Sequence, residues 1–268
     1  MSKHRQWCRP SEILAVLGCA DVPLAWREAI AIGSYLHFRP GELHELRVSD
    51  LDLDAGELKI RRAYDEREKV VKTPKTEEGI RHHVTIPTTL LPLLRRIERE
   101  RAPNDLVAPI VSATPEKNRA GLFRDFLRAA SVTRAELFVE TETHLRIDFR
   151  SLRDSGITWR ILAEHRAEVI QRESGHEHIG TTLGYAKEVQ DRRGRYGAPF
   201  PAFPNDLTED IAPPHSSEQS SAERQRARIA GSSWSGRRDL RRSLRKGGSS
   251  HANAGFPARR GSCLSNVM

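Results

Sequence analysis

The sequence predicts an α+β fold that is mainly helical and contains a small sheet. Residues 23–36 are apolar and have a proline near their start, which is typical of a buried helix because the first turn does not need the proline N–H. Other segments either carry apolar residues on one helical face or alternate in the manner of strands. The amphipathic segments are 90–97, 122–130 and 168–174, and the alternating segments are 57–63, 70–73 and 81–87.

The stretch after the first predicted helix, residues 38–52, carries Arg39 and Glu42 three positions apart. An arginine presents a rigid fork of donors that matches phosphate oxygens, and it stays charged at any working pH. An exposed Arg/Glu pair at a helix start is ordinarily only solvated. The functional interpretation of this pair therefore depends on the segments that follow.

A turn-rich connection at residues 74–79 joins the last two predicted strands and contains Lys75. Lys72 lies at the end of the preceding strand. A lysine in a loop is usually just solvated, so this residue also gains meaning only from the rest of the chain.

An arginine, a histidine behind a glycine, and a tyrosine follow one another in the second half of the chain. They are Arg153, His176 after Gly175, and Tyr185. Gly175 is predicted to end the helix at 168–174, so the three side chains lie on different short helices or helix ends. If they converge, they suit a phosphodiester, because cations can hold its non-bridging oxygens while a tyrosine oxygen attacks phosphorus. A free phenol has a pKa near 10, so this attack needs nearby cations.

In this order the segments resemble the C-terminal catalytic domain of tyrosine site-specific recombinases, the phage-integrase family. Residues 38–52 resemble its Gly-x-Arg-x-x-Glu-Leu box, although His37 stands where a small residue is usual, and the hairpin resembles its Lys-Thr-x-x-Gly-x-Arg setting. Residues 149–159 resemble its Phe-His-Asp-Leu-Arg-x-Thr-x-x-Thr-Trp box, and residues 175–185 its Gly-His pair and Thr-Thr-x-x-Tyr signature. The resemblance covers about residues 20–188.

The resemblance implies a phosphate clamp. Arg39 and Arg153 would be its two arginines, and Glu42 would orient Arg39 through a charge-assisted hydrogen bond. The imidazole of His176 would donate to the phosphate.

The resemblance also implies a nucleophile and an acid. Tyr185 would attack phosphorus, and Lys75 would protonate the departing 5′-oxygen, which is otherwise a poor leaving group. Lys72 could take this task if the hairpin register differs.

One position departs from the family pattern. Arg150 replaces the histidine of the second box, which is thought to help accept the tyrosine proton. An arginine cannot act as a base because it does not lose its proton, although it can still donate to a phosphate oxygen. Since general acid–base help is typically worth about 10²–10⁴-fold in rate, the sequence predicts a weakened enzyme. His144 is close in sequence but out of register with the box, and is expected to be structural or exposed.

The resemblance therefore implies a mainly helical tyrosine-recombinase domain with a small antiparallel sheet or hairpin. It would break and rejoin double-stranded DNA at attachment-type sites through a 3′-phosphotyrosine, as a homo-tetramer, with no cofactor, metal or small-molecule substrate. A type IB topoisomerase and a non-catalytic DNA-binding remnant of an integrase remain alternatives.

Composition divides the chain into three expected parts. Residues 1–19 are a short segment, too small for the N-terminal clamp domain of full recombinases; residues 20–188 form the catalytic domain. Residues 189–268 hold 14 Lys and Arg against 7 Asp and Glu and are rich in Ser, Gly and Pro, so they are expected to be a disordered tail. Three widely spaced cysteines and the lack of a long apolar run favour a cytoplasmic protein with free thiols.

Overall fold

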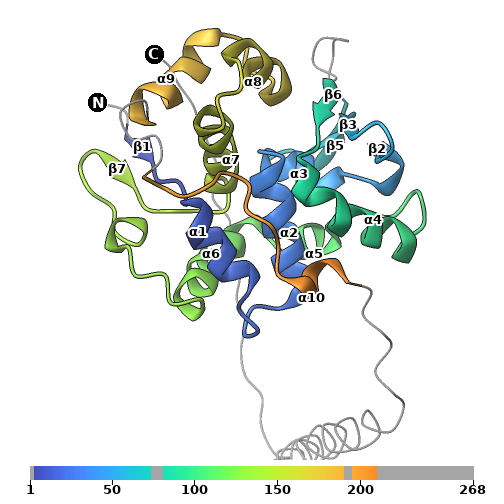
Figure 1. Ribbon diagram of the computed structural model, residues 1–268, viewed down its shortest axis with the longest axis horizontal. Coiled ribbons are helices and arrows are strands. Elements are labelled where there is room, and N and C mark those ends of the chain that lie inside the picture. Colours follow the sequence, from blue (N-terminus) through green and yellow to red (C-terminus); the bar gives the residue numbers. More distant parts are fainter. Residues whose placement is uncertain (1–2, 74–80, 190–194, 210–268) are drawn as a thin grey trace, which may run out of the picture. The chain divides into compact units, whose positions relative to one another are not determined.

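The computed structural model describes residues 3–73, 81–189 and 195–209, all of which lie in one compact unit, Met1–Asp210 (Figure 1). This unit is mainly helical with small sheets, as predicted. The helices are α1 (Pro10–Leu17), α2 (Leu24–Tyr35), α3 (Pro40–Glu45), α4 (Leu91–Glu100), α5 (Pro109–Ala113), α6 (Glu116–Ala129), α7 (Ser151–Leu162), α8 (Ala167–Ser174), α9 (Ile179–Val189) and α10 (Asn205–Thr208). The strands are β1 (His4–Arg5), β2 (Leu51–Asp52), β3 (Glu57–Ile60), β4 (Ala63–Asp65), β5 (Val70–Lys72), β6 (Arg81–Thr85) and β7 (His144–Leu145).

Helices α2 and α7 form the centre of the unit and lie side by side (Figure 1). In α2 every residue from Trp26 to Tyr35 is buried, and in α7 the same holds from Ser151 to Ile161. The prediction of a buried apolar helix at 23–36 is therefore confirmed. The two helices approach so closely that a Cβ built on Gly156 of α7 would lie 2.0 Å from the carbonyl oxygen of Ser34.

Strands β2, β3, β5 and β6 lie on one side of the helical core, and β1 and β7, which pair in parallel, lie on the other (Figure 1). β2, β3 and β6 form an antiparallel sheet in which Leu58 pairs with Val84, and the register shifts between Leu58 and Ile60. β4 and β5 form an antiparallel hairpin, with Ala63 opposite Lys72. The three alternating segments of the sequence thus supply β3, β5 and β6, with β4 beginning at the end of the first. Helix α3 packs against β4.

The amphipathic segments predicted at 90–97 and 122–130 correspond to α4 and the C-terminal part of α6. Their apolar residues face the core, since Leu93, Leu94, Ile97 and Leu127 are fully buried. Burying this surface is the main source of stability for such helices, because short helices are marginal by themselves in water.

The unit extends past both expected domain boundaries. At the N-terminus, Ile13 of α1 is fully buried, and the indole N–H of Trp159 donates to the Cys8 carbonyl at 2.9 Å. At the C-terminus, residues 195–209 run over α2 (Figure 1), where Tyr35 donates to the Pro201 carbonyl at 2.5 Å and Leu207 is fully buried. These fifteen residues were expected to belong to the disordered tail, but here they pack against the core and include the short helix α10.

Candidate active site

Arg39 is held by its own helix terminus. It precedes α3, and its backbone N–H and its guanidinium Nη1 donate to the two carboxylate oxygens of Glu42, at 2.8 and 2.9 Å. A glutamate at the third helical position commonly satisfies a backbone donor at the helix start in this way. The Glu42 side chain is only 6% exposed, whereas that of Arg39 is 46% exposed. Glu42 therefore fixes the arginine while leaving part of its donor fork at the surface.

Arg153 is buried in the first turn of α7 and is held by main-chain carbonyls. Its guanidinium donates to the His37 carbonyl at 2.9 Å and to the Ser174 carbonyl at 2.7 Å. Arg39 donates to the next carbonyl, that of Gly175, at 2.9 Å. The two arginines thus converge on the C-terminal end of α8, where the partial negative charge of the helix dipole attracts cations.

Gly175 ends α8 in the left-handed conformation, with φ 61° and ψ 47°, as its predicted C-cap role requires. The residue that follows, His176, is half-buried, and its Nδ1 lies 2.9 Å from the hydroxyl of Thr182 in α9. Its ring is parallel to that of Tyr185, with the ring centroids 6.2 Å apart. The helix end therefore presents an imidazole beside the two arginines and the tyrosine.

The phenol of Tyr185 donates to a carboxylate oxygen of Asp154 at 2.6 Å. Burial and the neighbouring Asp154 charge raise the pKa of Tyr185 above its ordinary value, while Arg153 and Arg150 partly oppose this rise. Sequence reasoning missed Asp154. Its position in the sequence was the available signal. Asp154 directly follows Arg153 and lies four residues after Arg150, so a helix brings it to the same face as Arg150.

Arg150 lies just before α7 and is exposed, at the junction of two cavities. The larger cavity, about 750 Å³, lies between the β4–β5 hairpin, α6 and the start of α7, and Arg39 also lines it. The smaller one, about 290 Å³, is lined by Asp154 and Tyr185 as well as Arg150. Arg150 therefore connects the Arg39 side of the site with the tyrosine side.

A buried ionic network lies behind the site and explains His37, the departure from the first box. His37 has a positive φ of 44° and is fully buried, and the Nε–H of Arg160 donates to its Nδ1 at 3.1 Å. Arg160 also pairs with Glu173 at 2.9 Å, and both side chains are 1% exposed. Thr85 of β6 donates its hydroxyl to the same glutamate at 2.8 Å. The network joins α7, α8 and β6, the elements that carry or adjoin the site.

Of the two hairpin lysines, Lys75 lies outside the described residues. Lys72 is paired with Asp65 at 2.7 Å and with Glu68 at 2.8 Å, and the hydrogen bonds that it donates to these carboxylates raise its pKa above the ordinary value. Lys72 therefore holds its proton firmly within the hairpin, which makes it a poor donor to a leaving group.

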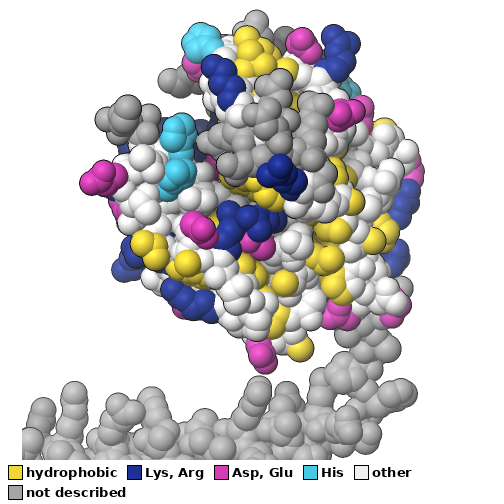
Figure 2. Space-filling model, turned by 60° about the vertical axis from the view of Figure 1, so that its left-hand side comes forward, with side chains coloured by type: hydrophobic (Ala, Val, Ile, Leu, Met, Phe, Trp, Pro, Cys, Tyr) yellow, Lys and Arg dark blue, Asp and Glu magenta, His cyan; other side chains and the backbone are white. Residues whose placement is uncertain are grey.

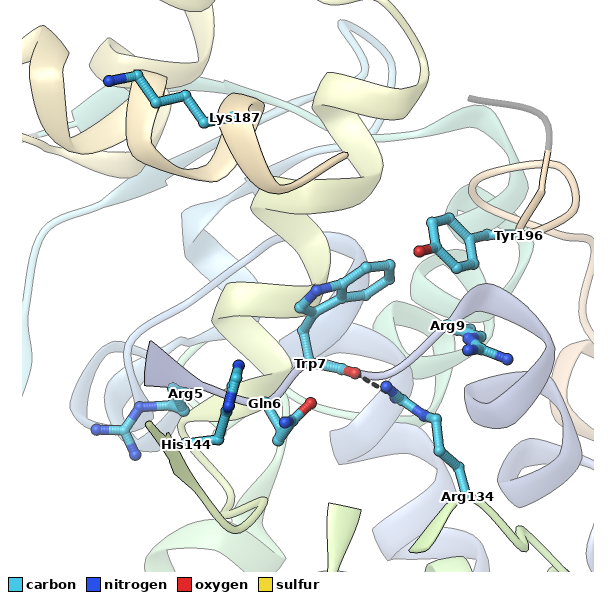
Figure 3. Close-up of a pocket in the computed structure, with 8 residues that line it drawn as sticks. All are labelled: Arg5, Gln6, Trp7, Arg9, Arg134, His144, Lys187 and Tyr196. Carbon is cyan, nitrogen blue, oxygen red and sulfur yellow. Dashed lines mark hydrogen bonds between the residues drawn. The ribbon is translucent and has the colours of Figure 1, made fainter. Parts of the chain in front are cut away.

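A third pocket lies beside the tyrosine side of the site (Figure 3). Its volume is about 360 Å³, and it brings together cationic side chains from distant segments, such as Arg5 and Arg134. These cations are largely compensated, because Arg134 pairs with Glu12 at 2.7 Å and donates to the Trp7 carbonyl, and Arg5 pairs with Asp148 and Asp154. On the face shown in Figure 2, basic side chains correspondingly gather beside acidic ones. His144 lines this pocket and is half-buried.

Two absences concern only the described part of the chain. Residues 3–73, 81–189 and 195–209 contain no helix that is long and apolar enough to cross a membrane. The same residues contain no cluster of three or more His, Cys, Asp or Glu side chains that could hold a metal ion.

Solved structures share this fold. The Tn1549 transposon integrase in complex with a circular intermediate DNA is 18% identical, with a TM-score of 0.52 over 71% of this chain and 66% of that chain. The same integrase in complex with transposon right end DNA is 15% identical, with a TM-score of 0.52 over 70% of this chain and 66% of that one. The chain thus spans just under two thirds of the integrase chains it matches. XerA recombinase aligns over 73% of this chain and 66% of its own, with 16% identity and a TM-score of 0.49.

Sequence comparison assigns the family. No curated protein sequence matches the chain. The family model described as "Phage integrase family" matches residues 7–192, which is more than half of the chain and includes the N-terminal residues that pack into the core. The chain belongs to the phage integrase family.

Proposed function

We propose that this chain cuts and rejoins DNA one strand at a time through a 3′-phosphotyrosine at Tyr185. The observation that carries the proposal is the convergence at the end of α8. Arg39 and Arg153 donate to the neighbouring carbonyls of Gly175 and Ser174, and His176 follows with its ring stacked parallel to that of Tyr185. Two arginines and an imidazole that could donate to a phosphate thus gather at the end of α8, and the ring of Tyr185 lies beside the imidazole.

The two arginines are suited to different parts of phosphate binding. Arg153 is buried and donates to two carbonyls, so it can contribute a fixed positive charge that needs no reorganisation during the reaction. Arg39 is partly exposed, so its fork can take a phosphate oxygen while Glu42 keeps it aligned. Removing one such preorganised donor typically lowers the rate by about 10²–10³-fold.

In the proposed step, the Tyr185 oxygen forms a bond to phosphorus while the bond from phosphorus to the 5′-oxygen breaks. Lys75 donates a proton to that departing oxygen. The phosphotyrosine retains the energy of the broken ester, so attack by a 5′-hydroxyl from another strand can reverse the step without a nucleotide cofactor or a metal. Arg150, in the place of the box histidine, would contribute charge to the phosphate and no proton transfer.

The proposed partner is double-stranded DNA, and recombination would require a homo-tetramer on two sites. The Tn1549 integrase, which has the same fold, was solved in complex with DNA from its own transposon. The cavity lined by Arg39 and Arg150 lies between the hairpin and α6, where a backbone phosphate could reach both arginines.

Covalent capture tests the proposal. The full chain is incubated with nicked suicide duplexes tiled across the DNA that flanks its gene, and the products are run on a denaturing gel. A slower band that depends on Tyr185 is expected; the control is Tyr185→Phe, which keeps the ring and removes only the hydroxyl. An unchanged band in the control, or no band with any duplex, would contradict the proposal.

The second candidate is a DNA-binding remnant of an integrase that no longer cleaves. Arg150 favours it, because the side chain in the histidine's place cannot accept a proton. This candidate predicts the same DNA binding for the wild type and Tyr185→Phe, measured by gel shift over a range of salt concentrations, and no covalent band from either.

A further inference from the structure

The replacement of the box histidine by Arg150 leaves the proton of Tyr185 without an evident acceptor in the proposed reaction. A tyrosine oxygen that bonds to phosphorus must give up its proton, and arginine cannot take it. Among the described residues, the side chain of Asp154 places a carboxylate oxygen within hydrogen-bonding distance of the phenolic oxygen. Oδ1 of Asp154 lies 2.6 Å from the phenolic oxygen, within the range required of a general base.

Asp154 is largely buried and held in place by its contacts, unlike a solvated carboxylate at the surface. Its side chain is 10% exposed, lies in the first turn of α7, and contacts Tyr185 of α9. Its other oxygen lies 3.3 Å from Nε of Arg5 in β1. Arg153 of the same helix and Arg150, which directly precedes it, are further charged groups that act on the carboxyl. One oxygen is thus anchored by a cation while the other contacts the phenol.

We infer that Asp154 is the catalytic base of this chain, accepting the Tyr185 proton as the phenolic oxygen attacks phosphorus. This inference rests on the proposed cleavage reaction. In the forward step the O–H bond of Tyr185 breaks, its oxygen bonds to phosphorus, and the proton moves to Asp154. In the rejoining step Asp154 returns that proton to the tyrosine oxygen as the phosphotyrosine bond breaks.

The direction of the pKa change is compatible with this role. Burial raises the pKa of the Asp154 carboxyl above its ordinary value, although the Tyr185 hydrogen bond and the three arginines partly oppose the rise. A base whose pKa lies closer to the working pH is more effective. The phenol also becomes a stronger acid as its oxygen bonds to phosphorus, so a carboxylate can take the proton during attack.

The same hydrogen bond could instead hold Tyr185 in its protonated form and so slow cleavage, and this role can be told apart from that of a base. If Asp154 only restrains Tyr185 and keeps it protonated, removal of the carboxylate charge will free the nucleophile and speed cleavage. Asp154→Asn separates the two roles, because the amide has nearly the same shape but cannot accept a proton from the phenol and become a neutral acid. A base predicts a loss of about 10²–10⁴-fold in the rate of adduct formation, and a restraint predicts no loss or a gain.

The experiment measures the single-turnover rate of covalent adduct formation on suicide duplexes for the full-length wild type and for Asp154→Asn. The matched control is Asp148→Asn, which removes the other carboxylate that pairs with Arg5 without touching Tyr185. A large loss in Asp154→Asn and a small change in Asp148→Asn are expected. Equal rates for the wild type and Asp154→Asn would overturn the inference while leaving the proposed function intact. No adduct from the wild type would overturn both.

A second measurement separates loss of the base from misfolding and from loss of the acid. A duplex with sulfur in place of the 5′-bridging oxygen has a thiolate leaving group, which does not need a proton because a thiol is far more acidic than an alcohol. With this substrate, the rate of adduct formation by Lys75→Ala should return to near the wild-type rate, while that of Asp154→Asn should stay low. In addition, the wild-type rate should rise with pH through an acid limb that reports ionisation of Asp154, and this limb should vanish in Asp154→Asn. Rescue of Asp154→Asn by the sulfur substrate, or an unchanged acid limb, would overturn the inference.

Discussion

The contact between α7 and the end of α2 determines where Arg153 lies, and Gly156→Ala tests it directly. A Cβ at Gly156 would lie 2.0 Å from the Ser34 carbonyl oxygen and 2.8 Å from the His37 Cβ, where ordinary contacts begin near 3.4 Å. Because the nearest atom belongs to the backbone, it cannot turn aside, and α7 must move by roughly 1 Å or more to restore normal contact distances. Overpacking of this kind costs about 1–3 kcal/mol.

Helix propensity opposes that cost, since alanine is about 1 kcal/mol more favourable than glycine inside a helix. We therefore expect Gly156→Ala to lower the free energy of unfolding by a net of about 2 kcal/mol at most. Gly121→Ala in α6 is the matched control, because a Cβ there would meet no other described heavy atom within 4 Å. Helix propensity alone predicts that the free energy of unfolding of this control rises by about 0.5–1 kcal/mol.

Urea unfolding of the full chain, followed by tryptophan fluorescence, measures both variants, and a change in midpoint at constant slope reports stability. Adduct formation gives a second readout: His37, whose carbonyl accepts from Arg153, also contacts the new methyl group, so cleavage should fall in Gly156→Ala and not in Gly121→Ala. If both variants were stabilised equally and cleaved normally, the close packing of α7 on α2 would be refuted.

Three further predictions address the ion network, the hairpin and the C-terminal segment. Glu173→Gln should destabilise the fold by about 3–5 kcal/mol in urea unfolding, because it leaves the buried Arg160 charge uncompensated; unaltered stability would contradict the pairing. Lys75→Ala should slow adduct formation by about 10²–10⁴-fold on oxygen-linked DNA, while Lys72→Ala should change it little; the reverse order would exchange their roles. Leu207→Ala should cost about 2–5 kcal/mol if residues 195–209 pack in solution as described, and thermal unfolding that is unaffected would argue against that packing.

Most of the local structure could be predicted because its signals lie close together in the sequence. The proline-led apolar run gives α2, and Gly175 in the left-handed conformation ends α8. The spacing between Arg39 and Glu42 corresponds to a capping contact within one helical turn. Each of these features depends on neighbours within a few residues, so periodicity and turn chemistry are sufficient to find them.

Features that depend on distant partners could not be predicted in this way. The carbonyls that hold Arg39 and Arg153 belong to α8, and the order of residues 195–209 comes from contacts with Tyr35 and its neighbours. The Asp154 carboxylate gains its contact with Tyr185 only when α9 packs against α7. A single sequence indicates which residues are available for such contacts, and the fold decides which of them meet.

Arg150, the N-cap of α7, and Asp154 in its first turn are four residues apart, and their properties are best understood as a pair. A permanent cation stands at the junction of the two cavities, and a carboxylate one turn further contacts the nucleophile. If Asp154 takes the proton, Arg150 is no defect, because it is free to act on the phosphate alone. Arg150→His should then lower cleavage, or leave it unchanged, when Asp154 is present.

The same substitution should raise cleavage in an Asp154→Asn background, because the new imidazole supplies the missing acceptor. The two substitutions should therefore be strongly non-additive in a double-mutant cycle of adduct-formation rates. A rise after Arg150→His alone would instead support a site weakened by the loss of its histidine, as the sequence by itself predicts. The sign of that single change consequently decides whether this chain has lost its proton acceptor or has replaced it with Asp154.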